Sequence, residues 1–171
     1  MVSSTNKWSR EELEEAWARY QDKVVEVGKT WDWAGYANVF TEDATYHEHA
    51  LGDMTGRDAI RDWIVSTMNE FPGSEMPFYP TSWYSIDTDR GWVFCEFLNR
   101  MRDPGDGSIH QAANLSVMKY AGDDLWSYEE DAYNPMNFLP VVRDYIQRSK
   151  ACGTVTDDAI AFAKNMNWEL A

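Results

Sequence analysis

A phenol and a carboxylate alternate with two histidines along one short segment, Tyr46-His47-Glu48-His49. We predict a strand over residues 44–49. Because successive side chains of a strand point to opposite faces, Tyr46 and Glu48 share one face and the two histidines share the other. A carboxylate in an aromatic-walled cavity loses solvation, so its pKa rises and it can accept or donate a proton near pH 7. Enolisation, aldol cyclisation and loss of water all require such a group.

Two other acidic residues, Glu96 and Asp131, lie on other predicted strands and could supply a second inward carboxyl. Two carboxyls at close range cannot both ionise easily, so one becomes an acid and the other a base. In the run Glu129-Glu130-Asp131, alternation requires at least one side chain to face water. Asn114 could hold a substrate carbonyl or enolate oxygen, and Tyr133, on the face of Asp131, could add a hydroxyl donor.

Each of these residues also has a structural alternative. Glu48 could be a solvated strand residue, and Glu96 could form an ion pair with Arg100 or Arg102. Asn114 could only satisfy backbone groups at a bulge. The residue types alone leave these alternatives open.

The histidines suggest a metal site, because His47 and His49 point the same way and His110 could be a third ligand. Their face lies opposite Glu48, however, so the three histidines should not converge. Cys95 lies in the middle of a predicted strand, without a histidine pattern to activate its thiol. We therefore predict neither a metal nor another cofactor.

The composition excludes several classes of partner. The 171 residues include 15 Lys+Arg and 29 Asp+Glu, a formal net charge of −14. Such a surface repels phosphate backbones and anionic lipid, so we expect no nucleic-acid partner and no membrane partner. The two cysteines, Cys95 and Cys152, are far apart in the chain, which predicts a reduced, cytoplasmic setting.

Three helices are predicted before the main run of strands. Residues 9–12, Ser-Arg-Glu-Glu, form a capping-box pattern that should begin the first helix, and Gly28 should end it. The second helix spans 32–40 and carries Trp33. The third follows Gly56, carries Trp63 and ends at the Pro-Gly pair 72–73.

The rest of the chain predicts strands and then two closing helices. The strands are expected over residues 82–87, 92–102, 109–120 and 125–134, and the helices from residue 135 or 140 to about 150 and over 156–167. Helices followed by hairpin-connected strands indicate an α+β fold, a cone-shaped, curved antiparallel sheet wrapped by the N-terminal helices. We expect one domain over residues 1–150, with 151–171 as a helical extension that packs on the domain or on a partner subunit.

The segments FTEDATY (40–46), GRDAI (56–60) and WSYEEDAY (126–133) resemble the SnoaL-like branch of the NTF2-like superfamily, over roughly residues 10–148. The resemblance implies an α+β barrel and a homodimer joined through the outer sheet face, where Leu115 and Val117 could serve. The superfamily includes isomerases, cyclases, dehydratases, epoxide hydrolases and non-catalytic binders, so the fold does not fix the reaction.

Matching positions imply roles for single residues. Glu48 stands where ketosteroid isomerases have a catalytic Asp, and Asp131 matches the acid–base Asp of the SnoaL cyclase. Asn114, within the Ala-Asn-Leu of residues 113–115, resembles the substrate-holding Asn of scytalone dehydratase, but that enzyme's catalytic His pair has no match here.

The resemblance to limonene-epoxide hydrolases is incomplete. Tyr46 and Glu48 match their water-positioning Tyr and Asn, and Glu96 and Asp131 match their two Asp. Phe94 stands where their bridging Arg is expected, which argues against epoxide hydrolysis by that mechanism.

We therefore predict a cofactor-independent acid–base enzyme, an isomerase, cyclase or dehydratase that acts on a hydrophobic carbonyl compound such as a polyketide, terpenoid or steroid-like ring. Glu48 and Asp131 are the predicted proton-transfer residues. The predicted substrate contacts are Tyr46, Glu96, Asn114, Tyr133, Trp33 and Trp63. The alternatives are a non-catalytic pocket for such a ligand, an epoxide hydrolase-like enzyme without the usual Arg, and an interaction module.

Overall fold

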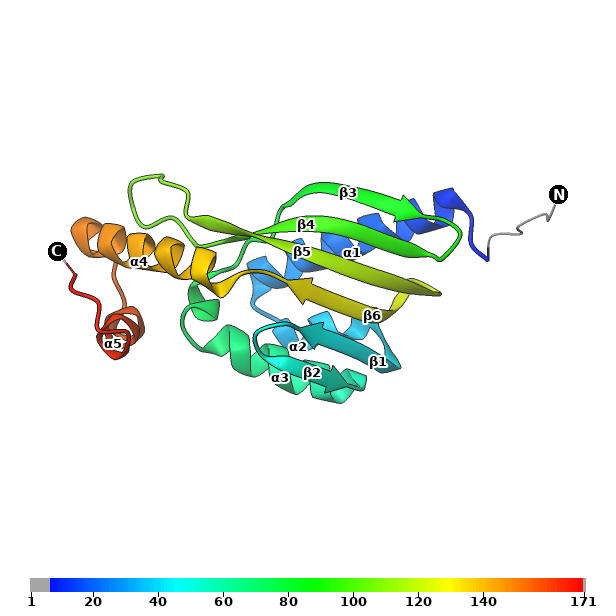
Figure 1. The fold of residues 1–171 in the computed structure, drawn as a ribbon, viewed down its shortest axis with the longest axis horizontal. Coiled ribbons are helices and arrows are strands. Elements are labelled where there is room, and N and C mark those ends of the chain that lie inside the picture. The colour runs from blue at the N-terminus through cyan, green and yellow to red at the C-terminus, as the bar shows by residue number, and fades with distance from the viewer. Residues whose placement is uncertain (1–6, 171) are drawn as a thin grey trace.

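The structure, a computed structural model, describes residues 7–170 and combines helices with one curved sheet (Figure 1). The helical elements of the first half are α1 (Arg10–Thr30), α2 (Trp33–Tyr36), the 3-10 turn η1 (Ala37–Val39), α3 (Arg57–Asn69) and the 3-10 turn η2 (Gly73–Glu75). Within residues 7–170, no helix has the length and apolar character needed to cross a bilayer.

Six strands form the sheet in the spatial order β2-β1-β6-β5-β4-β3. They are β1 (Phe40–Glu48), β2 (Gly52–Thr55), β3 (Thr81–Asp87), β4 (Trp92–Arg100), β5 (Gln111–Gly122) and β6 (Leu125–Ala132). The predicted α+β class is confirmed, with two differences. The pair of β1 and β6 is parallel, whereas the other pairs are antiparallel. The short strand β2, which pairs with the end of β1, was not predicted.

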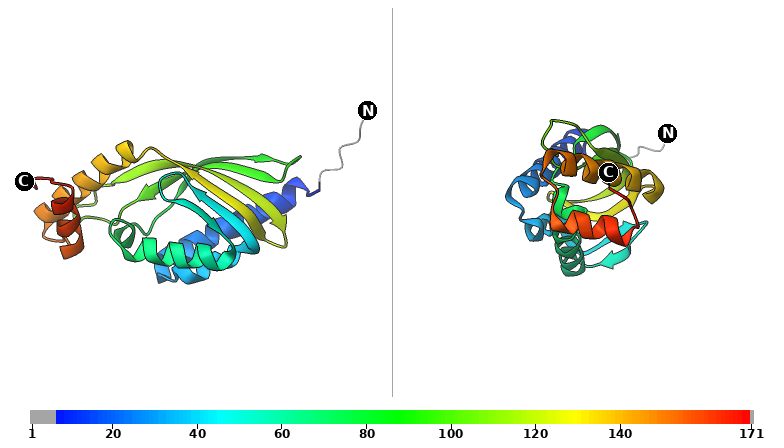
Figure 2. Two further views of the ribbon diagram at one scale, coloured as in Figure 1. Left: turned by 60° about the horizontal axis from the view of Figure 1, so that its bottom comes forward. Right: turned by 90° about the vertical axis from the view of Figure 1, so that its left-hand side faces the viewer.

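The helices α1 and α3 cover one side of the curved sheet and leave the other side open (Figure 2). Helix α1 buries six residues at helical spacing against the sheet: Leu13, Ala16, Trp17, Tyr20, Val24 and Val27. We call the side of the sheet that these helices cover the inner face. The opposite side of the sheet is the outer face.

The start of α1 is as predicted, but its end is not. The Ser9 hydroxyl accepts a hydrogen bond from the Glu12 amide at 3.1 Å, as a helix cap requires. The helix continues past Gly28 to Thr30 and ends at Trp31, which adopts a left-handed conformation. Gly28 is instead a close-contact position, because a Cβ atom there would lie 2.1 Å from the Pro77 carbonyl oxygen.

The last two helices, α4 (Pro135–Cys152) and α5 (Asp157–Asn165), project from one end of the sheet (Figure 1). They form a second hydrophobic cluster that includes Met76, Met101, Val142, Tyr145, Ile146, Ala159 and Ala163. The buried carboxylate of Glu75 in η2 accepts hydrogen bonds from the hydroxyls of Tyr145 in α4 and Thr156 at the start of α5, and so fastens both helices to η2. A separate extension from residue 151 stays a prediction.

Candidate active site

A cavity of about 120 Å³ lies against the inner face of the sheet. Its aromatic lining residues are Tyr20, Trp33, Tyr36, Tyr46, Trp63, Tyr79, Phe97 and Tyr133, and its acidic ones are Glu48, Glu129 and Asp131. No Lys, Arg or His within residues 7–170 lines it. Within the same range, no lining residue comes from α4 or α5, so these helices do not form its lid.

Glu129 lines this cavity and is hydrogen-bonded to three tyrosines. It is 2% exposed. Its carboxylate oxygens accept hydrogen bonds from Tyr36 at 2.8 Å, from Tyr20 at 3.0 Å and from Tyr46 at 3.3 Å. Burial raises the pKa of Glu129 well above its ordinary value, and the nearby Asp131 charge adds to this, while the tyrosine hydrogen bonds oppose it. These surroundings favour the protonated form of Glu129 over a wider pH range than for an ordinary glutamate.

Asp131 lies two residues further along β6 and is tied to Glu129 through one hydroxyl. The Tyr46 oxygen is 2.5 Å from Asp131 Oδ2 and 3.3 Å from Glu129 Oε1. Ser116 donates a hydrogen bond to Asp131 Oδ1, and Asn114 Nδ2 donates to Ser116 Oγ at 3.2 Å. Burial raises the pKa of Asp131, but hydrogen bonds from Ser116, Tyr46 and Asn114 favour its charged form. Of the two carboxyls, Asp131 is therefore the one that ionises more readily.

The strand register brings these side chains together. In the parallel pair of β1 and β6, Tyr46 lies across from Glu129 and Glu48 lies across from Asp131. On the other side of β6, Ser116 of β5 lies across from Asp131. Cross-strand partners share a face of the sheet, so Tyr46, Glu48, Glu129, Asp131 and Ser116 all reach the inner face.

Glu48, a predicted proton-transfer residue, is buried in the cavity wall but is held by the backbone. Its Oε2 atom accepts hydrogen bonds from the amides of Ala50, at 2.7 Å, and Leu51, so the carboxylate closes the turn between β1 and β2. Burial and a hydrogen bond to Glu48 raise the pKa of Tyr133. Glu48 and Tyr133 lie beside Leu51, which is 59% exposed and marks the mouth of the cavity.

The remaining predicted contacts divide into two groups. Trp33, Trp63, Asn114 and Tyr133 line the cavity, and their contact with a substrate stays a prediction. Glu96 does not line the cavity. It is on the outer face of β4, where its carboxylate accepts a hydrogen bond from Ser82 at 2.5 Å. The reason is alternation, because its neighbours Cys95 and Phe97 are the buried residues of that strand.

Sequence reasoning missed Glu129, although a signal for it was present. Glu129 is two residues before Asp131, so a strand that turns Asp131 inward turns Glu129 inward as well. Alternation also requires at least one side chain of the run Glu129-Glu130-Asp131 to face solvent. That side chain belongs to Glu130, which faces outward and is 2.9 Å from His49.

The arrangement supports proton transfer. Asp131, the carboxyl that ionises more readily, lies beside Glu129, whose pKa is raised further, and beside several tyrosine hydroxyls. Burial raises the pKa values of Tyr20, Tyr36 and Tyr46, so these phenols stay protonated and act as donors. Such a site can remove a proton from carbon and stabilise the resulting oxygen anion with O–H donors.

The comparisons with known proteins agree with this fold. A family model described as SnoaL-like domain matches residues 10–127. Among curated proteins, no sequence matches the chain.

Three solved structures are similar to it at low sequence identity. One is a protein of Catenulispora acidiphila with a ketosteroid isomerase-like fold, in complex with trimethylamine, with a TM-score of 0.56, 18% identity and coverage of 75% of this chain and 90% of that one. A Bacillus subtilis protein, provisionally described as an isomerase, has a TM-score of 0.56, 14% identity and coverage of 85% and 97%. A de novo designed protein with a curved β-sheet has a TM-score of 0.55, 10% identity and coverage of 78% and 94%. These likenesses show the fold alone.

Proposed function

The chain belongs to the SnoaL-like domain family, and from that premise we propose that it is a cofactor-independent, isomerase-type enzyme that acts on a small carbonyl compound. One observation carries the proposal. The Tyr46 hydroxyl joins two inward carboxyls, Glu129 and Asp131, and burial raises the pKa of both, that of Glu129 more strongly. Such a pair provides one base and one acid in the same cavity.

In the proposed reaction, Asp131 accepts a proton from the carbon next to the substrate carbonyl. The electrons of that C–H bond form the enolate, whose oxygen accepts hydrogen bonds from O–H donors around Glu129. Return of the proton from Asp131 to a different carbon completes an isomerisation and restores the carboxylate. No electron carrier is needed, because the substrate is neither oxidised nor reduced.

The cavity volume limits the substrate. Engineered cavities of about 150 Å³ hold benzene, so 120 Å³ suits one small ring. A larger polyketide, terpenoid or steroid-like compound would place its carbonyl-bearing ring inside and extend past Leu51 at the mouth. Cyclisation and dehydration also begin with removal of a proton next to a carbonyl, and they remain variants of the same proposal.

The test measures proton exchange on carbon directly. Cyclohexanone and 3-cyclohexen-1-one are incubated with the protein in D₂O, and NMR follows loss of the α-proton signal and appearance of the conjugated isomer. We expect Asp131→Asn to lower the rate about 10²- to 10⁴-fold. Glu96→Gln is the matched control, since it removes a carboxylate from the outer face of the same sheet.

The variants also decide between the two predicted bases. If Asp131 is the base, Glu48→Gln lowers the rate much less than Asp131→Asn, because the Glu48 carboxylate already binds two backbone amides. If Glu48→Gln abolishes exchange and Asp131→Asn does not, the assignment is reversed. Full activity in both variants would refute the acid–base proposal.

A second candidate function is non-catalytic binding of a small organic cation. Aromatic rings and carboxyls line the cavity, and cations bind favourably over such rings. The Asn114 side-chain oxygen, which is buried, has no hydrogen-bond partner among residues 7–170 and could accept one from an ammonium N–H. The Catenulispora structure contains trimethylamine. Saturable quenching of tryptophan fluorescence by trimethylammonium chloride, without ketone turnover, would favour this function.

We also propose a homodimer joined through the outer face of strands β3 to β5, in a reducing cytoplasmic setting. Leu115 on that face is 51% exposed and Trp83 is 47% exposed, which is consistent with a covered apolar surface. Sedimentation velocity should show a dimer for the wild type and a monomer for Leu115→Asp. Wild-type protein that sediments as a monomer at micromolar concentration would contradict the dimer.

A further inference from the structure

A second polar cluster lies on the outer face of the strands that carry the cavity. In the register of the sheet, His47 of β1 lies across from Asp53 of β2 on one side and from Glu130 of β6 on the other. Cross-strand partners share a face, and His49, two residues after His47, shares it too. Two imidazoles and two carboxylates therefore gather on three adjacent strands.

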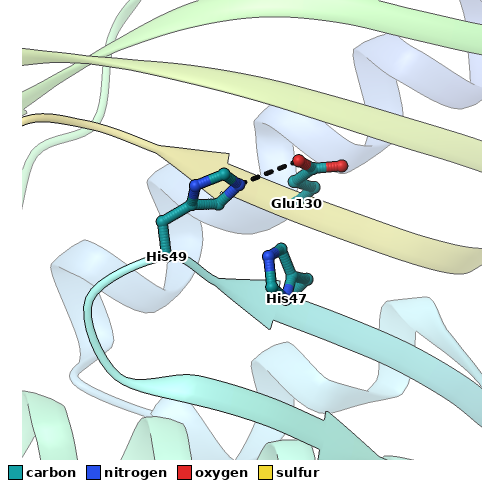
Figure 3. Close-up of side chains that lie close together, drawn as sticks. All are labelled: His47, His49 and Glu130. Atoms are coloured by element: carbon teal, nitrogen blue, oxygen red, sulfur yellow. Dashed lines mark hydrogen bonds and ion pairs between the residues drawn. The ribbon is translucent and has the colours of Figure 1, made fainter.

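The side chains point toward one another. Figure 3 shows His49 aimed at Glu130, with His47 beside them. His49 Nε2 is 2.9 Å from Glu130 Oε1, and the two imidazole centres are 4.6 Å apart. One ligand atom from each of His47, His49 and Glu130 lies within 4.8 Å of the other two.

We propose that His47, His49 and Glu130 bind a divalent transition-metal ion of the zinc type. Two imidazole nitrogens and one carboxylate oxygen form a ligand set that suits Zn²⁺ and its neighbours rather than Ca²⁺ or Mg²⁺, which prefer oxygen alone. The site is separate from the inner-face cavity and does not depend on the function proposed for it.

Small movements would complete the coordination. Zinc ligands at about 2.1 Å from the ion lie roughly 3.4 Å from one another in a tetrahedral site. The side chains of His47, His49 and Glu130 are 37%, 43% and 31% exposed, so they can rotate toward a common centre without displacing core residues. Because the face is exposed, water can occupy the fourth position.

Neighbouring groups already hold the ligands as a metal site requires. Ligand histidines usually bind a carboxylate through their second ring nitrogen, and His47 Nδ1 contacts Asp53 in this way, which leaves Nε2 for the ion. The Tyr128 hydroxyl donates to Glu130 Oε2 at 2.7 Å, and an ion would take the place of the contact between Glu130 Oε1 and His49 Nε2. With neutral imidazoles, the two carboxylates carry two negative charges that a divalent cation would offset.

The sequence alone suggests His110 as the third ligand. His110 is elsewhere, buried beside Tyr145 and 3.1 Å from Asp144. The third ligand comes instead from β6, and only the parallel pairing of β1 with β6 brings it to the histidines. A bound ion would link strands β1 and β6 directly, and β2 through Asp53.

The test uses the full chain after removal of metals with EDTA. Titration with ZnCl₂ in a calorimeter should show one ion per chain, and Co²⁺ should give the intense visible absorption of a tetrahedral site. Thermal unfolding should shift upward by roughly 5–10 °C at a hundredfold excess of zinc over its Kd, since the ion binds only the folded chain.

Variants locate the site. His47→Gln with His49→Gln should weaken zinc binding by about 100-fold or more, and Glu130→Gln by about tenfold or more. His110→Gln is the matched control, because it removes the remaining histidine and should leave zinc binding unchanged. Circular dichroism checks that each variant is folded. Absence of binding up to millimolar zinc, equal affinity in the wild type and the double variant, or loss of binding in His110→Gln would overturn the proposal.

Discussion

Strands β1 and β6 present two different polar clusters, one on each face of the same sheet. On the inner face, Glu129 and Asp131 are enclosed by tyrosines. On the outer face, Glu130 meets two histidines in contact with solvent. Neighbouring residues of β6 thus point to opposite faces of the sheet and belong to different clusters.

The comparison shows that surroundings, more than residue type, decide what a carboxyl does. Burial raises the pKa of Glu129 well above its ordinary value. For Glu130, hydrogen bonds from His49 and Tyr128 lower the pKa. The inner acid is suited to exchange protons, whereas the outer one stays charged and can bind a cation.

The largest contrast between the faces should be in stability. Trp126 is fully buried on the inner face and packs on Trp17 and Tyr20. Trp126→Ala should lower the free energy of unfolding by about 3–5 kcal/mol, through lost burial and a new cavity. In the monomeric Leu115→Asp background, Trp83→Ala on the exposed outer face should cost less than about 1 kcal/mol. Urea unfolding measures the loss of unfolding free energy in both variants, and equal losses would show that the two faces do not differ in packing.

A smaller effect should follow removal of the hydroxyl that joins the inner carboxyls. Tyr46→Phe should lower the rate of ketone proton exchange about 10- to 100-fold, because a hydrogen bond to a charged group is lost. The ring keeps its packing against Trp63, with 4.7 Å between centroids, so the fold should persist. Tyr84→Phe, at a half-exposed position of β3, is the control. An unchanged rate in Tyr46→Phe would remove this hydroxyl from the mechanism.

The raised pKa of Glu129 predicts a pH dependence of stability. A raised pKa in the folded state contributes stability that is full below the unfolded value, near pH 4.5, and is lost as the pH rises through the folded pKa. Glu129→Gln cannot ionise, so relative to the wild type it should gain up to about 1.4 kcal/mol per pH unit in that window. Urea unfolding from pH 5 to 8, in EDTA to keep the outer face free of metal, measures the difference. Parallel curves would mean that Glu129 is ionised in the folded state.

The smallest effect should come from the outer cluster without a metal. Exposed ion pairs contribute little, so His49→Gln in EDTA should change the free energy of unfolding by less than about 0.5 kcal/mol. With zinc present, the same substitution should abolish the thermal shift described above. A large loss of stability in EDTA would show that the cluster is a structural ion pair instead.

Much of the fold could be predicted from local patterns. The α1 cap at Ser9, the apolar stripe of α1 and the strands of the second half all follow from nearest-neighbour chemistry. The end of α1 could not be predicted in this way, because Gly28 is required by the approach of Pro77, which is distant in sequence. Strand β2 was missed because four residues are too few to show a period.

The candidate site could be predicted only in part, because it too depends on contacts between residues distant in the sequence. Alternation by itself determined that Tyr46 goes with Glu48, that Glu129 goes with Asp131, and that Glu130 faces the other way. It could not say which set is inside. Strict alternation from the buried Trp126 would turn Glu130 inward. The pairing of β5 with β6 is irregular, however, because Tyr120 pairs with Trp126 while its neighbour Lys119 pairs with Tyr128. The extra residue of β6 at this bulge reverses which face the following side chains reach. This shift depends on how β6 pairs with β5, so it exists only in the assembled sheet. The tertiary structure therefore decided that Glu129 and Asp131 are buried and that Glu130 is exposed on the outer face.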